Sequence, residues 1–391
     1  MKKVYFTPGP AELFPTVEKH IQTALAEQIG SISHRSQKFR DIYKFTVTQL
    51  RMLMNIPESH AIFFMSSATE IWERLVMNCV AWESFHLVNG SFSRKFYEFS
   101  VELRKHAHLF EKPLGEGFSY EDFENQLDKK RTTNKVLSRG GVQFTDESAV
   151  KIPEYAELVA LTHNETSSGV QMSPTDMHQL KRSYRDKLFC VDMVSSAPYP
   201  DLDFDLIDCA YFSVQKSFGL PAGLGVWIVN EKCLQKANQL RNNKDHEHLI
   251  GTYHSLPSLW KNYEKWETPE TPNVWNIYLL GKIAEDMNDH GIDLLRKETE
   301  LKAKKLYEFA DKSDAFDIFV KNPVHRSQTV VVLNTQGPAA EVIEALKQKN
   351  MVVGSGYGSL KPNQIRIANF PAVSVEQVET LIDEMKKLWI L

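Results

Sequence analysis

Residues 208–223 read DCAYFSVQKSFGLPAG, and this stretch decides the fold. Its apolar part, Cys209 to Val214, has the length and composition of a buried β-strand. Lys216 follows this run, and a glycine-rich turn then leads to a second apolar run, Leu224 to Val229. Burying an ammonium group costs several kcal/mol unless the group is paired or chemically altered. A lysine at the end of a buried strand therefore indicates a function.

A second apolar run, Leu188 to Val191, ends on an acid, Asp192, one strand upstream of Lys216. Pyridoxal phosphate is bound in proteins by a lysine that forms a Schiff base and by an acidic partner for the pyridine nitrogen. An amine and an acid at the ends of neighbouring strands thus predict a pyridoxal phosphate site. In this interpretation Lys216 holds the cofactor covalently, and Asp192 pairs with its ring nitrogen.

Short apolar runs alternate with longer amphipathic segments through the first two thirds of the chain. Apolar strands interleaved with helices predict an α/β fold whose mostly parallel sheet is covered on both faces. Ligands of such sheets bind beyond the carboxyl ends of the strands, where Asp192 and Lys216 lie. The predicted strands are 61–65, 85–88, 158–162, 188–191, 209–214 and 224–229, and the predicted helices are 70–82, 93–105, 174–184 and 231–241.

A break at residues 267–273, ETPETPN, divides the chain. Before it, residues 241–266 are expected to form a polar loop, and residues 114–151 to form surface connections or an edge hairpin. The segments after the break have the pattern of a small α+β domain: helices 274–289, 294–312, 339–349 and 375–388, with strands 329–333 and 364–369. The predicted domains are an N-terminal arm (1–15), a large cofactor-binding domain (16–266) and a small C-terminal domain (267–391).

The composition excludes several classes of protein. The 391 residues are 42% hydrophobic and carry a net charge of -4, as expected for a globular protein without a basic surface for nucleic acid. No window approaches the ~20 apolar residues of a membrane span. Prolines interrupt the apolar stretch at the start of the chain, so a signal peptide is not expected there. Four scattered cysteines indicate reduced thiols in a cytoplasm. The histidines show no metal-ligand spacing beyond His246-Glu247-His248, so no metal site is expected.

Small and polar residues follow three of the predicted strands. Ser67 and Glu70 have the spacing of a capping box, and this helix start is either an ordinary one or a phosphate site. Thr166 lies in a polar loop, where its hydroxyl can reach a cofactor. Phe92 follows a Gly-Ser turn and is either a core ring or a ring that stacks on the pyridine.

Two arginines are candidates for binding a substrate, because guanidinium makes bidentate contacts to carboxylate and phosphate. Arg35, beside His34, is either a solvated charge or a contact for an anionic substrate. Arg366 interrupts an apolar strand and therefore needs an anionic partner. That partner is either a substrate α-carboxylate or a carboxylate of the protein.

The whole set of motifs resembles the class V, fold-type I pyridoxal-phosphate aminotransferases, and most closely the phosphoserine aminotransferases. The resemblance covers nearly the whole chain. The motifs that carry it are Thr7-Pro8-Gly9-Pro10-Ala11, Ile32 to Ser36, Ser66 to Thr69, Gly90 to Ser93, Asn164-Glu165-Thr166, Asp192 to Ser196, Gln215-Lys216, Gly219 to Gly223, Thr271-Pro272 and Ile365-Arg366-Ile367.

The resemblance implies a large domain with a mostly parallel, seven-stranded type of sheet, and a role for each matching residue. Lys216 and Asp192 would be catalytic. The implied cofactor contacts are Ala68 and Thr69 to the phosphate, Phe92 to the ring face, Thr166 and Gln215 by hydrogen bonds, and Thr271 to the cofactor of a partner subunit. The last contact implies a homodimer with shared active sites. Arg366 would bind the substrate α-carboxylate, and Arg35 with His34 the distal anion.

The chain departs from the phosphoserine aminotransferases at four places. It has Phe92 where they usually have tryptophan, Ser66-Ser67 in place of a glycine pair, and Glu270 in place of asparagine. It also lacks their His-Arg pair before the carboxylate-binding arginine. Residues 354–361, GSGYGSLK, are instead similar to the alanine–glyoxylate and serine–pyruvate branch.

The sequence therefore predicts a phosphoserine:2-oxoglutarate aminotransferase of serine biosynthesis, with ping-pong amino transfer between amino acids and 2-oxo acids. The first alternative is an aminotransferase of the alanine–glyoxylate or serine–pyruvate type. The second alternative is a non-catalytic α/β binding protein, in which Lys216 is only paired with an acid.

Overall fold

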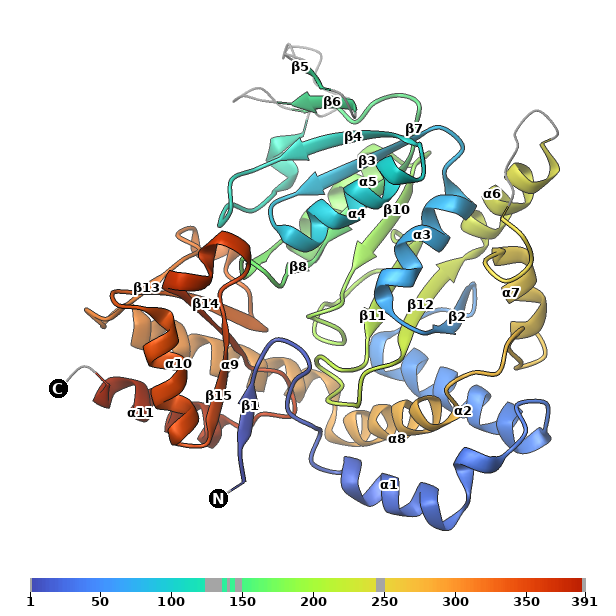
Figure 1. Cartoon of the computed structure of the whole chain (residues 1–391). Coiled ribbons are helices and arrows are strands. Elements are labelled where there is room, and N and C mark those ends of the chain that lie inside the picture. The colour runs from blue at the N-terminus through green and yellow to red at the C-terminus, as the bar shows by residue number, and fades with distance from the viewer. Residues whose placement is uncertain (1, 124–135, 139–140, 145–149, 244–249, 389–391) are drawn as a thin grey trace.

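The computed structural model of the chain describes residues 2–123, 136–138, 141–144, 150–243 and 250–388. Its centre is a nine-stranded sheet, next to which a five-stranded sheet forms a smaller unit (Figure 1). The strands of the large sheet, in spatial order, are β2 (His60–Met65), β12 (Gly225–Asn230), β11 (Cys209–Ser213), β10 (Leu188–Asp192), β7 (Ala156–Thr162), β3 (Glu83–Val88), β4 (His106–Glu111), β6 (Gly141–Phe144) and β5 (Val136–Ser138).

The large sheet is mostly parallel, as the sequence predicts. Strands β11, β10, β7, β3, β4 and β6 run parallel to one another, whereas β12 is antiparallel to both β11 and β2. Strands β5 and β6 form an antiparallel pair at one edge, so the described part of residues 114–151 contains the expected hairpin. Residues 246–248 lie outside the described residues.

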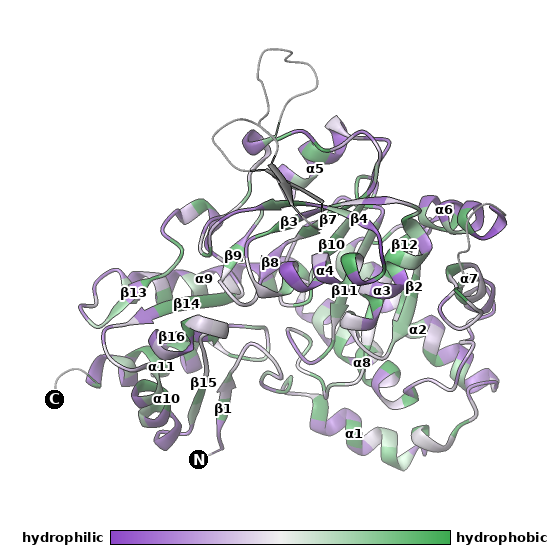
Figure 2. Ribbon diagram, turned by 45° about the horizontal axis from the view of Figure 1, so that its top comes forward, coloured by the Kyte–Doolittle hydropathy of each residue, from purple (hydrophilic) through white to green (hydrophobic). Residues whose placement is uncertain are grey.

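Successive residues of each strand point to opposite faces of the sheet, and both faces are apolar. Ile62 and Phe64 of β2 pack into one hydrophobic cluster, and Phe63 between them packs into another. One face is covered by α1 (Val17–Ala26), α2 (Gln37–Met54), α5 (Pro174–Ser183) and α8 (Val274–His290). The other is covered by α3 (Ala68–Cys79), α4 (Ser91–Glu102), α6 (Glu231–Asn242) and α7 (Leu256–Tyr263). Figure 2 shows the hydrophobic colour in the strands between these layers.

The smaller sheet joins the two ends of the chain. In spatial order it contains β1 (Val4–Phe6), β15 (Met351–Ser355), β16 (Gln364–Ala368), β14 (Val330–Thr335) and β13 (Phe316–Ile318). Strand β1 pairs in parallel with β15, with Val4 opposite Met351. Helices α9 (Ile292–Ala310), α10 (Ala339–Gln348) and α11 (Val375–Lys387) pack on one face of this sheet.

Several elements differ from the sequence prediction. Residues 241–266 were expected to be a loop, but α7 forms there because Leu256 and Leu259, three residues apart, are buried against the sheet. The short or histidine-containing strands β1, β4, β13 and β15 were not predicted. The predicted domain division before residue 267 stays a prediction. Helix α8 follows this division in the sequence, but it packs against the core of the large sheet.

Two expectations from composition can be compared with the structure. All four cysteines are free and buried, as predicted. In the part of the chain that the structure describes, no helix combines the length and the apolar character that crossing a bilayer requires.

A buried ion pair holds the amino end of the large sheet together. Asp208, just before β11, accepts hydrogen bonds from Lys181 Nζ of α5 (2.7 Å) and from the Phe189 N–H of β10 (2.8 Å). Its other oxygen accepts a bond from Asn230 Nδ2 at the end of β12 (2.9 Å). The side chains of Lys181 and Asp208 are only 4% and 1% exposed.

We expect Asp208→Ala to lower the free energy of unfolding by about 3–5 kcal/mol, because it leaves the buried Lys181 ammonium without a counter-charge. Urea unfolding followed by circular dichroism measures this change. The matched control is Glu344→Ala, which removes an exposed acid paired with the exposed Lys347 (3.2 Å) and should cost less than about 1 kcal/mol. Equal effects of the two substitutions would contradict the prediction.

Candidate active site

Strands β10 and β11 carry the two residues predicted to be catalytic to the same end of the sheet. The strands are parallel neighbours, with Asp192 opposite Tyr211. Asp192 is the last residue of β10, and Lys216 lies in the turn three residues after β11 ends at Ser213. The predicted strand ended at residue 214, one residue nearer to Lys216 than the observed end. Lys216 still lies at the expected edge of the sheet.

The Lys216 ammonium lies in a largely desolvated position. Its Nζ donates a hydrogen bond to the Pro8 carbonyl (2.5 Å) and lies 5.8 Å from the centre of the Phe92 ring. Burial, with the nearby Arg366 charge, lowers the pKa of Lys216 to about 8. Gly9 permits this approach, since a Cβ at Gly9 would lie 2.5 Å from Lys216 Cε. A lysine with this pKa supplies the neutral amine that nucleophilic chemistry requires.

Asp192 is a buried carboxylate with few donors. One oxygen accepts a bond from the Val194 N–H (2.8 Å), and the other accepts one from the Tyr211 hydroxyl (3.1 Å). The Trp72 indole N–H in turn donates to that hydroxyl (2.6 Å) and fixes its position. Burial, reinforced by the charge of Glu165, raises the pKa of Asp192 to about 7. A cation placed at this carboxylate would restore its ionised form.

Arg366 of β16 connects the small sheet to the loop that follows β7. Its Nη1 donates to the Thr166 carbonyl (3.1 Å), and its Nε donates to the Ser355 carbonyl (2.7 Å). The Thr166 hydroxyl donates to Ser195 Oγ (2.7 Å). These arginine bonds go to carbonyls rather than to a carboxylate, so the guanidinium keeps a positive charge beside Lys216, whose pKa it lowers.

Glu165 belongs to the motif Asn164-Glu165-Thr166, but no role was predicted for it. Its buried carboxylate accepts five hydrogen bonds, from the N–H groups of Phe92 (3.3 Å), Ser93 (2.9 Å) and Ser167 (3.1 Å) and from the hydroxyls of Ser93 (2.8 Å) and Ser167 (2.7 Å). A carboxylate at the first turn of α4 is favoured by the free N–H groups there. Glu165 thereby positions Phe92 above Lys216.

Lys95 and Tyr357 also lie at the site, and the sequence analysis did not select them. The Phe92 and Tyr357 rings are 5.3 Å apart, and Lys95 Nζ donates to the Tyr357 hydroxyl (3.1 Å). The Arg366 guanidinium lies 5.4 Å from the Tyr357 ring. The signal for Lys95 was its position one turn after Phe92 on the same helix.

The start of α3 has the predicted cap, with one difference. The Ser67 side chain accepts a bond from the Glu70 N–H (3.2 Å), but the Glu70 carboxylate accepts one from the N–H of Ser66 (3.0 Å) and not of Ser67. The Ala68 N–H donates to Ser213 Oγ at the end of β11 (3.2 Å), so this helix start lies beside the turn that carries Lys216. The Ala68 and Thr69 phosphate contacts stay predictions, as does the Gln215 contact.

Arg35 lies in a second cluster, close to the junction segment. Its Nη1 donates to Glu267 Oε2 (3.2 Å) and to the Thr268 carbonyl (2.9 Å). Thr271, a few residues later, is exposed in the single chain, and His34 is half-buried. The structure thus ties Arg35 to the segment of Thr271, and the roles predicted for His34, Arg35 and Thr271 stay predictions.

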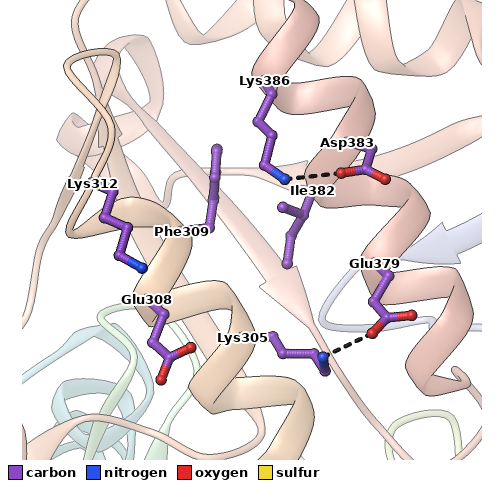
Figure 3. Close-up of a pocket in the computed structure, with 8 residues that line it drawn as sticks. All are labelled: Lys305, Glu308, Phe309, Lys312, Glu379, Ile382, Asp383 and Lys386. Atoms are coloured by element: carbon purple, nitrogen blue, oxygen red, sulfur yellow. Dashed lines mark hydrogen bonds and ion pairs between the residues drawn. The ribbon is translucent and has the colours of Figure 1, made fainter.

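A groove lies in the surface of the small unit (Figure 3). It has a volume of about 450 Å³ and lies between α9 and α11. Two of its lysines pair with two of its acids, since Lys305 Nζ lies 2.7 Å from Glu379 and Lys386 Nζ lies 2.9 Å from Asp383. The other two charged residues that line it, Glu308 and Lys312, have opposite signs. These charges neutralise each other, so the groove is a weaker candidate than the Lys216 site.

The comparison with known families identifies the class of reaction that this protein catalyses. Residues 125–378 match the model of the family described as Aminotransferase class-V. The chain belongs to this family. It is therefore an enzyme, a pyridoxal-phosphate-dependent transaminase that acts on amino acids and 2-oxo acids, and the alternative of a non-catalytic binding protein is wrong.

Individual relatives support the same assignment. The aminotransferase is 45% identical to a phosphoserine aminotransferase from Cytophaga hutchinsonii, with 98% of each chain covered and a TM-score of 0.89. It is 25% identical over 380 residues to a phosphoserine aminotransferase of Rhodococcus opacus, covering 95% of this chain and 91% of that one. An alanine–glyoxylate aminotransferase from Nostoc sp. is 19% identical with a TM-score of 0.79, and shows the fold alone.

The site of this aminotransferase fits the cofactor that its family implies. Asp192 is a buried acid that accepts bonds from the Val194 N–H and the Tyr211 hydroxyl and makes no ion pair with a described residue. A protonated pyridine nitrogen is a cation that would pair with this carboxylate. Lys216 offers the amine, and the start of α3 offers N–H groups for a phosphate. We therefore expect these residues to hold pyridoxal phosphate.

We expect the acetylation rate of Lys216 in the cofactor-free aminotransferase to rise with pH through a midpoint near 8, because only the neutral amine reacts and burial lowers its pKa to about 8. An ordinary lysine continues to gain reactivity up to a pH of about 10.4. Pulse labelling with an acetylating reagent, followed by peptide mass spectrometry, gives the midpoint. A midpoint for Lys216 near that of ordinary lysines would show that the desolvation is too weak to matter.

Proposed function

We propose that this transaminase moves the amino group between phosphoserine and 2-oxoglutarate in a ping-pong reaction of serine biosynthesis, in the cytoplasm. One observation carries the proposal: the site has two separate cations beside the Tyr357 ring, with the Arg366 guanidinium 5.4 Å and Lys95 Nζ 5.6 Å from its centre. Phosphoserine, glutamate and 2-oxoglutarate each have two anionic ends, whereas alanine and glyoxylate have one carboxylate. The 45% identity to a phosphoserine aminotransferase supports the same choice.

Arg366 is proposed to bind the substrate α-carboxylate. Its guanidinium already uses Nε and Nη1 for the Ser355 and Thr166 carbonyls, which fixes the plane of the group. The remaining N–H donors can reach a carboxylate, and charge-assisted bonds of this kind are the strong ones. The desolvation that lowers the pKa of Arg366 also strengthens its attraction for an anion.

Lys95 is proposed to bind the distal anion, in place of the His-Arg pair that this chain lacks. Its exposed Nζ lies at the rim of the site, 5.5 Å from the Phe92 ring and hydrogen-bonded to the Tyr357 hydroxyl. Arg35 and His34, next to the segment of Thr271, would complete the site from the other subunit of a homodimer. The Thr271 hydroxyl, exposed in the single chain, supports this arrangement.

The proposal gives each residue of the site a role in the reaction. Pyridoxal phosphate, when bound, supplies a ring that draws electron density away from the substrate Cα. Asp192 would keep a negative charge at the ring nitrogen, and Lys216 Nζ would take the proton from the substrate Cα and deliver it to the cofactor carbon that carries the amino nitrogen, with the reverse transfer for the 2-oxo acid. Glu165 positions Phe92, which would lie against the ring face, and Phe92 with Tyr357 would limit the access of water.

The alanine–glyoxylate or serine–pyruvate type is the second candidate function. The segment 354–361 carries the similarity to that branch, and its Tyr357 contacts Phe92, Lys95 and Arg366. This places the divergent segment directly at the site. A smaller substrate would leave Lys95 without an anion to bind.

We expect the enzyme to use phosphoserine with 2-oxoglutarate at a kcat/KM about 10- to 100-fold above that for alanine with glyoxylate, because one charge-assisted contact is worth about 1.5–3 kcal/mol. A panel of amino donors and acceptors, assayed by product chromatography, measures the ratio. Lys216→Ala should abolish turnover with every pair and should leave no covalent adduct after borohydride reduction. A reversed ratio would move the enzyme to the second candidate function.

We expect Lys95→Met to raise KM for phosphoserine about 10-fold with little change in kcat, because it removes a contact made in both ground and transition states. The KM for alanine, which has no distal anion, should stay unchanged. Lys304→Met, at an exposed lysine of α9 paired with Glu308, is the matched control and should alter neither value. An equal loss with alanine would show that Lys95 acts on the fold and not on the distal group.

A further inference from the structure

Two histidines and a glutamate meet at the amino ends of β3 and β4, away from the catalytic edge. His106 and His108 are two residues apart on β4, so their side chains lie on the same face of the strand. Glu83, the first residue of β3, is directly opposite His106 in the parallel register. No metal site was expected from the sequence, since its histidines showed no metal-ligand spacing beyond residues 246–248. The two-residue spacing of His106 and His108 brings them to one face only because β4 is a strand.

The three side chains are close enough to bind one ion. Glu83 Oε2 lies 2.8 Å from His108 Nε2, and Glu83 Oε1 lies 3.5 Å from His106 Nδ1. One ligand atom from each residue lies within 4.8 Å of the other two. Ligand atoms around a tetrahedral zinc ion, each about 2.0–2.2 Å from the metal, are roughly 3.4 Å apart. Small side-chain rotations convert the observed geometry into this one.

The three side chains differ in exposure, as expected for a metal site that is buried on one side and open to solvent on the other. The His108 side chain is 5% exposed, Glu83 is 21% exposed and His106 is 53% exposed. The backbone below it is fixed, since Glu157 accepts bonds from the N–H groups of Trp82 (2.7 Å) and Glu83 (3.3 Å). An ion can therefore enter past His106 and reach the buried His108.

A simple ion pair is the alternative explanation of this group. Elsewhere in the described residues, His20 contacts Asp286 (2.7 Å) and His290 contacts Glu298 (3.1 Å), each as one histidine with one acid. The cluster at Glu83 differs because a second imidazole joins, with the rings of His106 and His108 only 4.5 Å apart. Two imidazoles that share one carboxylate form a ligand set typical of zinc.

We propose that Glu83, His106 and His108 form a zinc site, with a water as the fourth ligand. Glu83 is the first residue of β3, and the catalytic edge of the sheet lies at the other end of this strand, at Val88, roughly 16 Å away at about 3.3 Å per residue. The ion therefore takes no part in amino transfer. It joins the amino ends of β3 and β4 and stabilises the folded state by mass action.

The test is titration of the cofactor-loaded, chelator-treated enzyme with zinc chloride, followed by calorimetry and thermal unfolding. We expect one saturable site per chain and a melting temperature that rises with zinc. His106→Ala, at the exposed ligand, should weaken zinc binding at least about 10-fold and remove the thermal shift. Glu83→Gln should do the same, because an amide is a poor zinc ligand.

His290→Ala is the matched control, since it removes an exposed histidine that contacts a single acid. It should bind zinc and gain stability as the wild type does, and none of the three variants should change transaminase turnover. The proposal is overturned if the wild type shows no saturable binding, or if His106→Ala and His290→Ala bind zinc equally. The result is independent of the substrate proposed for the enzyme, because turnover and zinc binding are measured separately.

Discussion

The buried carboxylate of Glu165 is the contact on which the candidate active site depends. Its five hydrogen bonds connect the loop after β7 to the first turn of α4, and so fix Phe92 in position. Its charge also acts on three other ionisable groups of the site, raising the pKa of Asp192 and opposing the lowering of the pKa of Lys216 and Arg366. One acid thus sets both the geometry and the charge balance of the site.

The sequence reveals residues whose signal is local, and it hides residues whose role depends on contacts between distant elements. Lys216 and Asp192 were identifiable because a charge at the end of an apolar strand is conspicuous, and parallel strands bring such ends to one edge. Glu165, Lys95 and Tyr357 were not selected because their importance lies in partners on other elements, such as the contact between α4 and the segment after β15. Strand β4 was missed for a local reason: His106 and His108 interrupt its apolar pattern, although the latter is buried.

The two edges of the large sheet differ in the way they use charge. At the carboxyl edge, Lys216, Asp192 and Arg366 have shifted pKa values and bonds mostly to backbone groups, which leaves their charges available to ligands. At the amino edge, Asp208 is fully matched by Lys181 and Asn230. The sheet therefore separates groups that stabilise the fold from groups whose charges are only partly compensated, and such groups concentrate at functional sites.

The pairing of β1 with β15 has a consequence for synthesis of the protein. Val4 finds its partner Met351 only after about 350 further residues have been made, which takes roughly 20–70 s at ribosomal rates. Until then the Pro8 carbonyl, which accepts the Lys216 hydrogen bond, is not held in place by the small sheet. The large sheet can form early on the ribosome, but the environment of its reactive lysine is completed last.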